Sequence, residues 1–312
     1  MKNKPYRYLL YLGLRILQPI VLFLPRKFSF QIGKVLARLA FFFILKEREK
    51  TIRHLTLAYA GEKTTQEIYG LAYRVFLHWG EAVVEALRVP RLNRDKVDRL
   101  VETGDGLAKI ERILDEGKGM ILLTAHLGNW ELLAALVRLH GHPGTVVGKE
   151  IYYEKYNQEI LRLRGHITLR TIYQDASPRE LLEVLRKKEI LGILPDQDID
   201  SLEGIFVPFF GRPAYTVTSP VKLALVSGAP IVPVFLVRHG PHYRLLVEEP
   251  IRVEKKEDRE DTIREYTERW SRVIEDKIRT YPEQWVWMHR RWKTAPPPEA
   301  AQATLSGAQS HD

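Results

Sequence analysis

The chain has 312 residues, of which 45% are hydrophobic and 28% are charged, a balance typical of a folded globular protein. It contains no cysteine, which excludes disulfide bonds, thiolate nucleophiles and sulfur-ligated zinc sites. None of the histidines belongs to an HExxH pair, so we expect no metal site and no cofactor.

The formal net charge of +9 is concentrated in residues 1–50, which hold eleven Lys or Arg residues and two Glu residues. The rest of the chain is therefore close to neutral. Positive charge confined to an apolar N-terminal segment favours an anionic membrane surface as the partner. Nucleic acid is not expected, because no nucleic-acid-binding motif is present.

Two apolar runs lie within this basic segment. Residues 6–25 are about long enough to cross a bilayer, but an arginine, a glutamine and a proline interrupt them. Residues 36–45 are too short to span a bilayer, and basic residues flank them as in an interfacial segment. No small-residue cleavage site follows the first run, so we expect the segment to be retained. We interpret it as a membrane-anchoring helical segment, with two ordinary core helices as the alternative.

The rest of the chain alternates between helical and strand patterns. Residues 51–95 carry apolar side chains at helical spacing and predict a helical packing segment. Residues 96–293 predict an α/β domain with a mixed, largely buried sheet flanked by helices. Strands are expected at 120–125, 145–147, 167–172, 190–194, 231–237 and 243–247, and helices at 107–114, 130–139, 156–163, 179–186, 221–226 and 257–281. Residues 294–312 lack apolar periodicity and are expected to be disordered.

The most informative stretch is 117–139, in which a buried-type strand ends at His126 and a helix begins near Asn129. Asn129 is a suitable N-cap, Gly128 allows a tight turn, and Glu131 falls in the first helical turn. We expect His126 and Glu131 to face each other, so that the carboxylate orients the imidazole and the free nitrogen takes a proton from a hydroxyl. The alternative is a structural histidine, with Glu131 serving only the helix dipole.

Four blocks of sequence then occur in a fixed order. They are HLGNWE at 126–131, LPDQD at 194–198 followed by GIFVPFFGRPAYT at 204–216, KLALVSGAPIVPVF at 222–235, and PEQWVWMHRRWK at 282–293. Together they resemble the late lipid A acyltransferases (lauroyl and myristoyl transferases) of the lysophospholipid acyltransferase superfamily, to which a group that acylates phosphatidylinositol mannosides is related. One departure is His54, where family members usually carry Asn.

This resemblance implies the glycerolipid acyltransferase fold and transfer of a fatty-acyl chain from an acyl carrier protein or coenzyme A thioester to a hydroxyl of a lipid A precursor or related glycolipid. It also implies a place on the cytoplasmic face of the bacterial inner membrane. In that family, the histidine and the acidic residue of the first block are the catalytic pair, here His126 and Glu131. Without a cysteine or a nucleophile elbow, we expect direct transfer in a ternary complex. A lysophospholipid or glycerophosphate acyltransferase and a non-catalytic lipid-binding protein remain alternatives.

Further polar site residues are expected around this pair. Arg164 best matches the basic residue that the family directs to a substrate carbonyl or phosphate, with a solvated helix-face arginine as the alternative. Asp196 and Gln197 follow a strand that should end beside the one carrying His126, and we expect them to organise the acceptor site, with metal binding as the minor alternative. Asn129 is a further substrate-binding candidate. The aromatic and cationic residues of 285–292 suit a headgroup interface or stacking within the fold.

The segment after LPDQD is rich in aromatic residues. Phe206, Phe209 and Phe210 are expected to form the wall of an acyl-chain pocket, with ordinary core packing as the alternative. Gly211 and Arg212 lie where a phosphate contact is expected.

Overall fold

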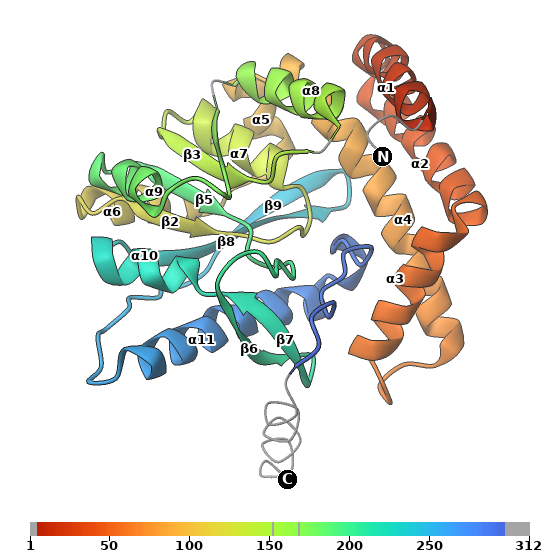
Figure 1. The fold of residues 1–312 in the computed structure, drawn as a ribbon. Helices are drawn as coiled ribbons and strands as arrows, with labels where there is room; N and C mark the ends of the chain where they lie inside the picture. Colours follow the sequence, from red (N-terminus) through yellow and green to blue (C-terminus); the bar gives the residue numbers. More distant parts are fainter. Residues whose placement is uncertain (1–4, 152, 168, 297–312) are drawn as a thin grey trace.

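In the computed structural model, which describes residues 5–296 apart from 152 and 168, a seven-stranded sheet lies between two layers of helices. The N-terminal helices form a separate group along one side of this α/β body (Figure 1). Almost all of the predicted disordered tail lies outside the described residues.

The central sheet is mixed, as predicted. Its strand order is β1-β9-β8-β2-β5-β3-β4, and every neighbouring pair is parallel except β8 and β9. All six predicted strands are present. The bounds are β1 Val101–Glu102, β2 Met120–Leu123, β3 Gly144–Gly148, β4 Arg170–Tyr173, β5 Ile190–Ile193, β8 Ile231–His239 and β9 His242–Val247. A separate antiparallel hairpin, β6 Gly204–Phe209 and β7 Arg212–Val217, was not predicted.

Strand β2 shows why the strands of the sheet have unbroken apolar sequences. Met120 and Leu122 pack into one hydrophobic core, while Ile121 and Leu123 pack into the other. Because successive side chains point to opposite faces, a strand covered on both faces has no polar positions to alternate with.

The two faces of the sheet are covered by different helices. Helices α6 and α7, with α5 packed on α7, cover one face, whereas α9, α10 and α11 cover the other, and α8 packs against β4 and the short helix η1. Their bounds are α5 Arg94–Leu100, α6 Gly106–Asp115, α7 Trp130–Leu139, α8 Glu154–Gly165, α9 Pro178–Arg186, α10 Ser219–Ser227, α11 Arg259–Thr280, η1 Val89–Arg91 and η2 Pro282–Gln284.

The N-terminal group consists of α1 Pro5–Phe23, α2 Arg26–Phe43, α3 Leu45–Ala58 and α4 Thr65–Leu87. Helix α2 packs so closely along α4 that a Cβ added at Gly33 would lie 2.7 Å from the Gly80 carbonyl oxygen. Ion pairs join Arg26 to Glu85 (2.6 Å) and Lys34 to Glu81 (3.0 Å), and Arg238 of β8 also pairs with Glu81. These partly buried charges tie α2 and α4 to the central sheet.

Much of the outer surface of α1, α2 and the α2–α3 bend is apolar and exposed. Within the described part of the chain, no single helix is both long and apolar enough to cross a membrane, whereas α2 and α3 taken together meet that test but are bent by 87°. The exposed large apolar side chains of this region are Tyr8, Leu9, Leu10, Ile16, Ile20, Phe23, Phe28, Val35, Leu36, Leu39, Phe42, Phe43, Ile44 and Leu45.

Candidate active site

His126 follows β2 at the carboxyl edge of the sheet and is held there by Asp196, which follows the neighbouring parallel strand β5. The His126 Nδ1 atom lies 2.8 Å from Asp196 Oδ1, and the His126 backbone N–H donates to Asp196 Oδ2 at 2.8 Å. The Trp285 indole N–H donates to the same Oδ2 at 2.8 Å. The Asp196 side chain is only 1% exposed, so these protein groups take the place of water around its carboxylate.

The surroundings of Asp196 favour its ionised form. Burial acts to raise the pKa of this carboxyl, but the charge and hydrogen bonds of His126 and the indole N–H of Trp285 outweigh it and hold the pKa well below its usual value. An ionised Asp196 requires a proton on His126 Nδ1, which leaves the lone pair on Nε2 free to accept a proton. Among the described residues, Asp196 belongs to no cluster of three side chains that could hold a metal ion.

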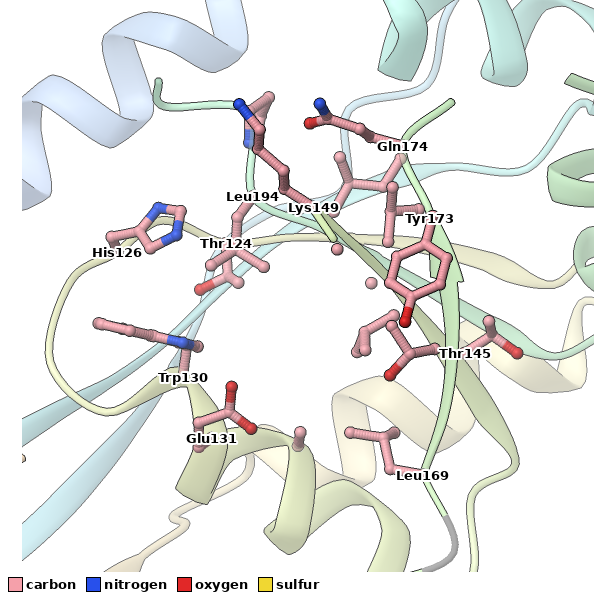
Figure 2. Close-up of a pocket in the computed structure, with 18 of the residues that line it drawn as sticks. Thr124, His126, Trp130, Glu131, Thr145, Lys149, Leu169, Tyr173, Gln174 and Leu194 are labelled. Atoms are coloured by element: carbon pink, nitrogen blue, oxygen red, sulfur yellow. The ribbon is translucent and has the colours of Figure 1, made fainter. Parts of the chain in front are cut away.

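The predicted contact between His126 and Glu131 is wrong. Glu131 instead pairs with Arg164 of α8 through two hydrogen bonds, from Arg164 Nη2 to Glu131 Oε1 at 2.6 Å and from Nε to Oε2 at 3.0 Å. Figure 2 shows Trp130 between His126 and Glu131, and the Trp130 ring packs edge-on against His126 with centroids 5.0 Å apart. The first turn of α7 thus carries the carboxylate away from the imidazole and toward a partly buried cation.

Arg164, predicted to contact a substrate carbonyl or phosphate, is therefore already paired with a carboxylate. Burial acts to lower the pKa of its guanidinium, but the Glu131 carboxylate outweighs this effect and raises the pKa. Both side chains line the same cavity as His126. The pair presents polar groups to that cavity without a net charge.

The turn between His126 and α7 forms as the sequence predicts. Gly128 has φ +64°, and an added Cβ would lie 2.0 Å from the Leu236 carbonyl oxygen, so only glycine fits. The Asn129 side chain accepts from the Leu132 N–H at 2.9 Å, which confirms the predicted N-cap. His78 of α4 lies with Nε2 3.2 Å from the Gly128 carbonyl oxygen, and therefore donates to it. The close backbone contact at Gly128, the Asn129 cap and the His78 hydrogen bond together hold this turn in place.

A cavity of about 1320 Å³ lies beside His126, and its aliphatic lining comes from α4, α7, α8, α9 and α10 together with strands β3 and β5. Figure 2 shows the part of its wall that holds His126, Trp130 and Glu131. This volume exceeds the roughly 300–1,000 Å³ usual for a site that holds one small molecule. Polar groups that face it include His126, Glu131, Arg164, Gln197 and His289. The arrangement brings a histidine to the wall of a large apolar cavity.

Gln197 and His289 complete the surroundings of His126. The Gln197 Nε2 atom lies 3.0 Å from His126 Nε2 and 3.2 Å from His126 Nδ1, so it stands over the face of that ring. The same atom is 3.2 Å from His289 Nε2, and the two imidazole centroids are 4.9 Å apart. Burial, followed by the charge of His126, lowers the pKa of His289 to about 4. Sequence reasoning missed the roles of Trp285 and His289, because spacing within 285–292 gives no sign that this segment returns to the end of β2. The only available signal was its place in a block that resembles the family.

The predicted aromatic wall of the cavity is wrong. Phe209 and Phe210 are buried in the core against Trp285 and Trp287, and Phe206 packs on the neighbouring strand. None of the three phenylalanines is among the described residues that line the cavity. Phe209 and Phe210 therefore follow the alternative prediction, ordinary core packing.

Gly211 and Arg212 also lie apart from the site. They occupy the turn of the β6–β7 hairpin, where Gly211 has φ +65°, and the Arg212 guanidinium donates to the Leu57 carbonyl oxygen at 3.0 Å. Neither residue is among the described residues that line the cavity. The tight turn accounts for the glycine, and a contact with the end of α3 accounts for the arginine.

Comparison with known proteins gives the family. Residues 2–294 match the family model for bacterial lipid A biosynthesis acyltransferases. The chain belongs to this family. The acyltransferase is 28% identical over 300 residues, 94% of each chain, to the lipid A biosynthesis lauroyltransferase of Escherichia coli. It is also 28% identical over 155 residues, 48% of each chain, to the phosphatidylinositol mannoside acyltransferase of Mycobacterium tuberculosis. A lipid A biosynthesis acyltransferase of Haemophilus influenzae is 27% identical over 185 residues, 57% of each chain. The resemblance noted in the sequence is thereby confirmed.

Proposed function

We propose that this acyltransferase moves a fatty-acyl chain from a thioester of acyl carrier protein or coenzyme A to a hydroxyl of a lipid A precursor or related glycolipid. The observation that carries the proposal is His126, held by the buried Asp196 carboxylate, with its Nε2 on the wall of a large apolar cavity. The names of the relatives, a lauroyltransferase of lipid A and an acyltransferase of phosphatidylinositol mannoside, support the choice of acceptor class.

The proposed reaction uses His126 as a general base. His126 Nε2 takes the proton of the acceptor hydroxyl while the hydroxyl oxygen attacks the thioester carbonyl carbon. A C–O bond forms, the tetrahedral intermediate collapses, and the C–S bond breaks with departure of the thiolate. The proton then passes from His126 to the thiolate sulfur. Asp196 keeps the imidazole in the required tautomer and stabilises the imidazolium. Such a base typically contributes about 10²–10⁴ in rate.

The size of the cavity and the composition of the chain support direct transfer in a ternary complex. A cavity volume of about 1320 Å³ leaves room for more than one hydrocarbon chain. The protein has no cysteine that could carry an acyl group as a covalent intermediate. The aliphatic side chains of the cavity, in place of the predicted phenylalanines, are the proposed walls for the acyl chain. We propose a lauroyl-like chain by analogy with the Escherichia coli relative.

The function is tested with purified enzyme, a lipid A precursor in detergent, and lauroyl donors on each carrier. Mass spectrometry of the lipid should show one added acyl chain with at least one donor, whereas lysophosphatidate and glycerol phosphate should be poor competing acceptors. Incubation with labelled donor alone, followed by acid quenching, should leave the intact protein mass unchanged. A stoichiometric adduct that moves to lipid on addition of acceptor would contradict direct transfer.

We also propose that the N-terminal helices attach the enzyme to an anionic membrane surface, which fits the bacterial inner membrane on its cytoplasmic side. Phe23 at the end of α1 is 83% exposed and Phe43 at the end of α2 is 78% exposed, on a segment that carries the whole excess of positive charge. An apolar surface flanked by basic residues is suited to insertion among anionic headgroups.

Point substitution is the suitable test, because α2 contributes ion pairs and close packing to α4, and its deletion would uncover that helix. Phe23→Ser combined with Phe43→Ser should reduce flotation with phosphatidylglycerol-containing vesicles by tenfold or more. Val226→Ser on α10 removes an apolar side chain that is 62% exposed in another part of the fold, and serves as the matched control. Equal flotation of the double variant and the control would contradict the proposed surface.

A further inference from the structure

The cavity beside His126 continues around the carboxyl edge of the sheet, from one face to the other. Leu122 and Leu133 line it on the face that α7 covers, where both belong to one hydrophobic core. Ile193 and Leu223 line it on the face that α9, α10 and α11 cover, where both belong to the other core. The cavity therefore has an α7/α8 arm and an α9/α10 arm. His126 lies where the two arms meet, because it follows the end of β2.

The two arms differ in the charge of their lining. The charged residues that line the α7/α8 arm are Glu131, Arg138, Glu159 and Arg164, so positive and negative charges balance there. The α9/α10 arm is lined by more cations than carboxylates, namely Lys149, Lys222 and Arg259 against Asp175 and Glu203. Its uncharged polar lining residues are Gln174, Ser201, Thr218 and Ser219. The α9/α10 arm is therefore suited to a polar ligand that carries negative charge.

The α9/α10 arm also lies away from the proposed membrane surface. Figure 1 shows α9, α10 and the start of α11 on the opposite side of the α/β body from α1 and α2. Val226 lines this arm and is 62% exposed, so the arm is open to solvent at that point. The α7/α8 arm, by contrast, is lined by Leu14 of α1. A water-soluble donor can therefore reach His126 through the α9/α10 arm, while a lipid acceptor approaches from the side of α1.

We propose that the α9/α10 arm binds the phosphopantetheine group of the thioester donor, and that Arg259 and Lys222 bind its phosphate. This inference rests on the proposed acyl transfer, and it concerns the part that acyl carrier protein and coenzyme A have in common. Phosphopantetheine carries amide and hydroxyl groups, which suit the polar lining of this arm, and it ends in a phosphate, which suits the cations. Its sulfur end meets His126, and the attached acyl chain continues into the α7/α8 arm.

The two cations are held differently before the donor binds. Arg259 is exposed at the first position of α11, and no ion pair within the described part of the chain involves it. Lys222 forms an ion pair with Glu203, whose side chain is 78% exposed. Exposed ion pairs are weak, so a phosphate can displace the Glu203 carboxylate from Lys222. Arg259 therefore offers the stronger test, and Glu203 is a competitor of the phosphate.

Donor kinetics test the inference with lauroyl thioesters of coenzyme A, of acyl carrier protein and of pantetheine, which lacks the phosphate. Arg259→Ala should raise the KM of the two phosphorylated donors about five- to tenfold with kcat within about twofold, because a charge-assisted contact is lost. The same variant should change the binding of the pantetheine thioester, followed as KM or as inhibition of a phosphorylated donor, by less than about twofold. Glu203→Gln should lower the KM of the phosphorylated donors about two- to threefold, since it frees Lys222.

The matched control is Arg272→Ala. Arg272 is another exposed arginine of α11, about 20 Å further along the helix, and is not among the described residues that line the cavity. Its substitution should leave the KM of every donor within about twofold. An unchanged KM in Arg259→Ala, an equal rise for the pantetheine thioester or in Arg272→Ala, or a rise for only one of two phosphorylated donors that the wild type accepts would overturn the inference while the proposed function stands. A wild-type enzyme that transfers no acyl group from any donor would refute the proposed function, and the inference with it.

Discussion

Replacing Asp196 with Asn should nearly abolish turnover through a change of tautomer. Asp196 Oδ2 accepts from two fixed donors, the His126 backbone N–H and the Trp285 indole, both at 2.8 Å. The single carbonyl oxygen of Asn would stay with these donors, so its NH₂ would face His126 Nδ1. That nitrogen would have to accept, the imidazole proton would move to Nε2, and no lone pair would remain to act as the base. In a serine protease, the corresponding change lowers kcat about 10⁴-fold, equivalent to roughly 5.5 kcal/mol.

The assay compares kcat and the donor KM of wild type, Asp196→Asn and Glu131→Gln at saturating acceptor. The loss in Asp196→Asn should fall on kcat, because Asp196 is buried behind His126 and is not among the described residues that line the cavity. Glu131→Gln breaks the pair with Arg164 but leaves the base intact, and should cost less than about a hundredfold. A kcat within tenfold of wild type in Asp196→Asn, or an equal loss in Glu131→Gln, would refute the role of Asp196 in setting the His126 tautomer.

Three further substitutions test the turn, the cavity and the buried charges. Gly128→Ala should lower the free energy of unfolding by about 2 kcal/mol or more in urea titrations, because the methyl group collides with the Leu236 carbonyl at a positive φ. Ala134→Phe narrows the cavity, and should lower kcat/KM about tenfold more for the longest acyl donor tested than for the shortest. His78 has a folded-state pKa lowered by burial from 6.5 to about 4, so the unfolded chain binds its proton first and stability falls as the pH drops through this range. His78→Gln should remove about 1.6 kcal/mol of the stability difference between pH 6.5 and pH 5, measured by urea unfolding at both values.

Local features of the site were predictable because short-range chemistry determines them. The buried strand before His126, the glycine turn and the Asn129 cap each depend on residues within a few positions of one another. The partner of His126 depends instead on two parallel strands whose ends lie 70 positions apart. The sequence placed Asp196 beside the correct strand, but the nearer Glu131 offered an equally plausible carboxylate. The hydrogen bond between His126 and Asp196 and the pairing of Glu131 with Arg164 separate the two alternatives.

The aromatic segment of the β6–β7 hairpin was misread for a related reason. Its two strands carry Pro208 and Pro213 directly opposite each other, and proline normally argues against a paired strand. A core and an acyl-chain wall require the same kinds of side chain, so composition could not decide between them. The burial of Phe209 and Phe210 against Trp285 and Trp287, on strands outside the central sheet, decides it.

The hydrogen bond from Trp285 to Asp196 has a consequence for the time at which the enzyme becomes active during its synthesis. A ribosome delivers α1 and α2 first, and domains begin to fold from the N-terminal end. Until Trp285 has emerged, the Asp196 carboxylate lacks one of its donors, and until His289 follows, the Gln197 amide is held from one side only. On the proposed membrane attachment, a nascent chain can therefore reach the lipid surface well before it can transfer an acyl group.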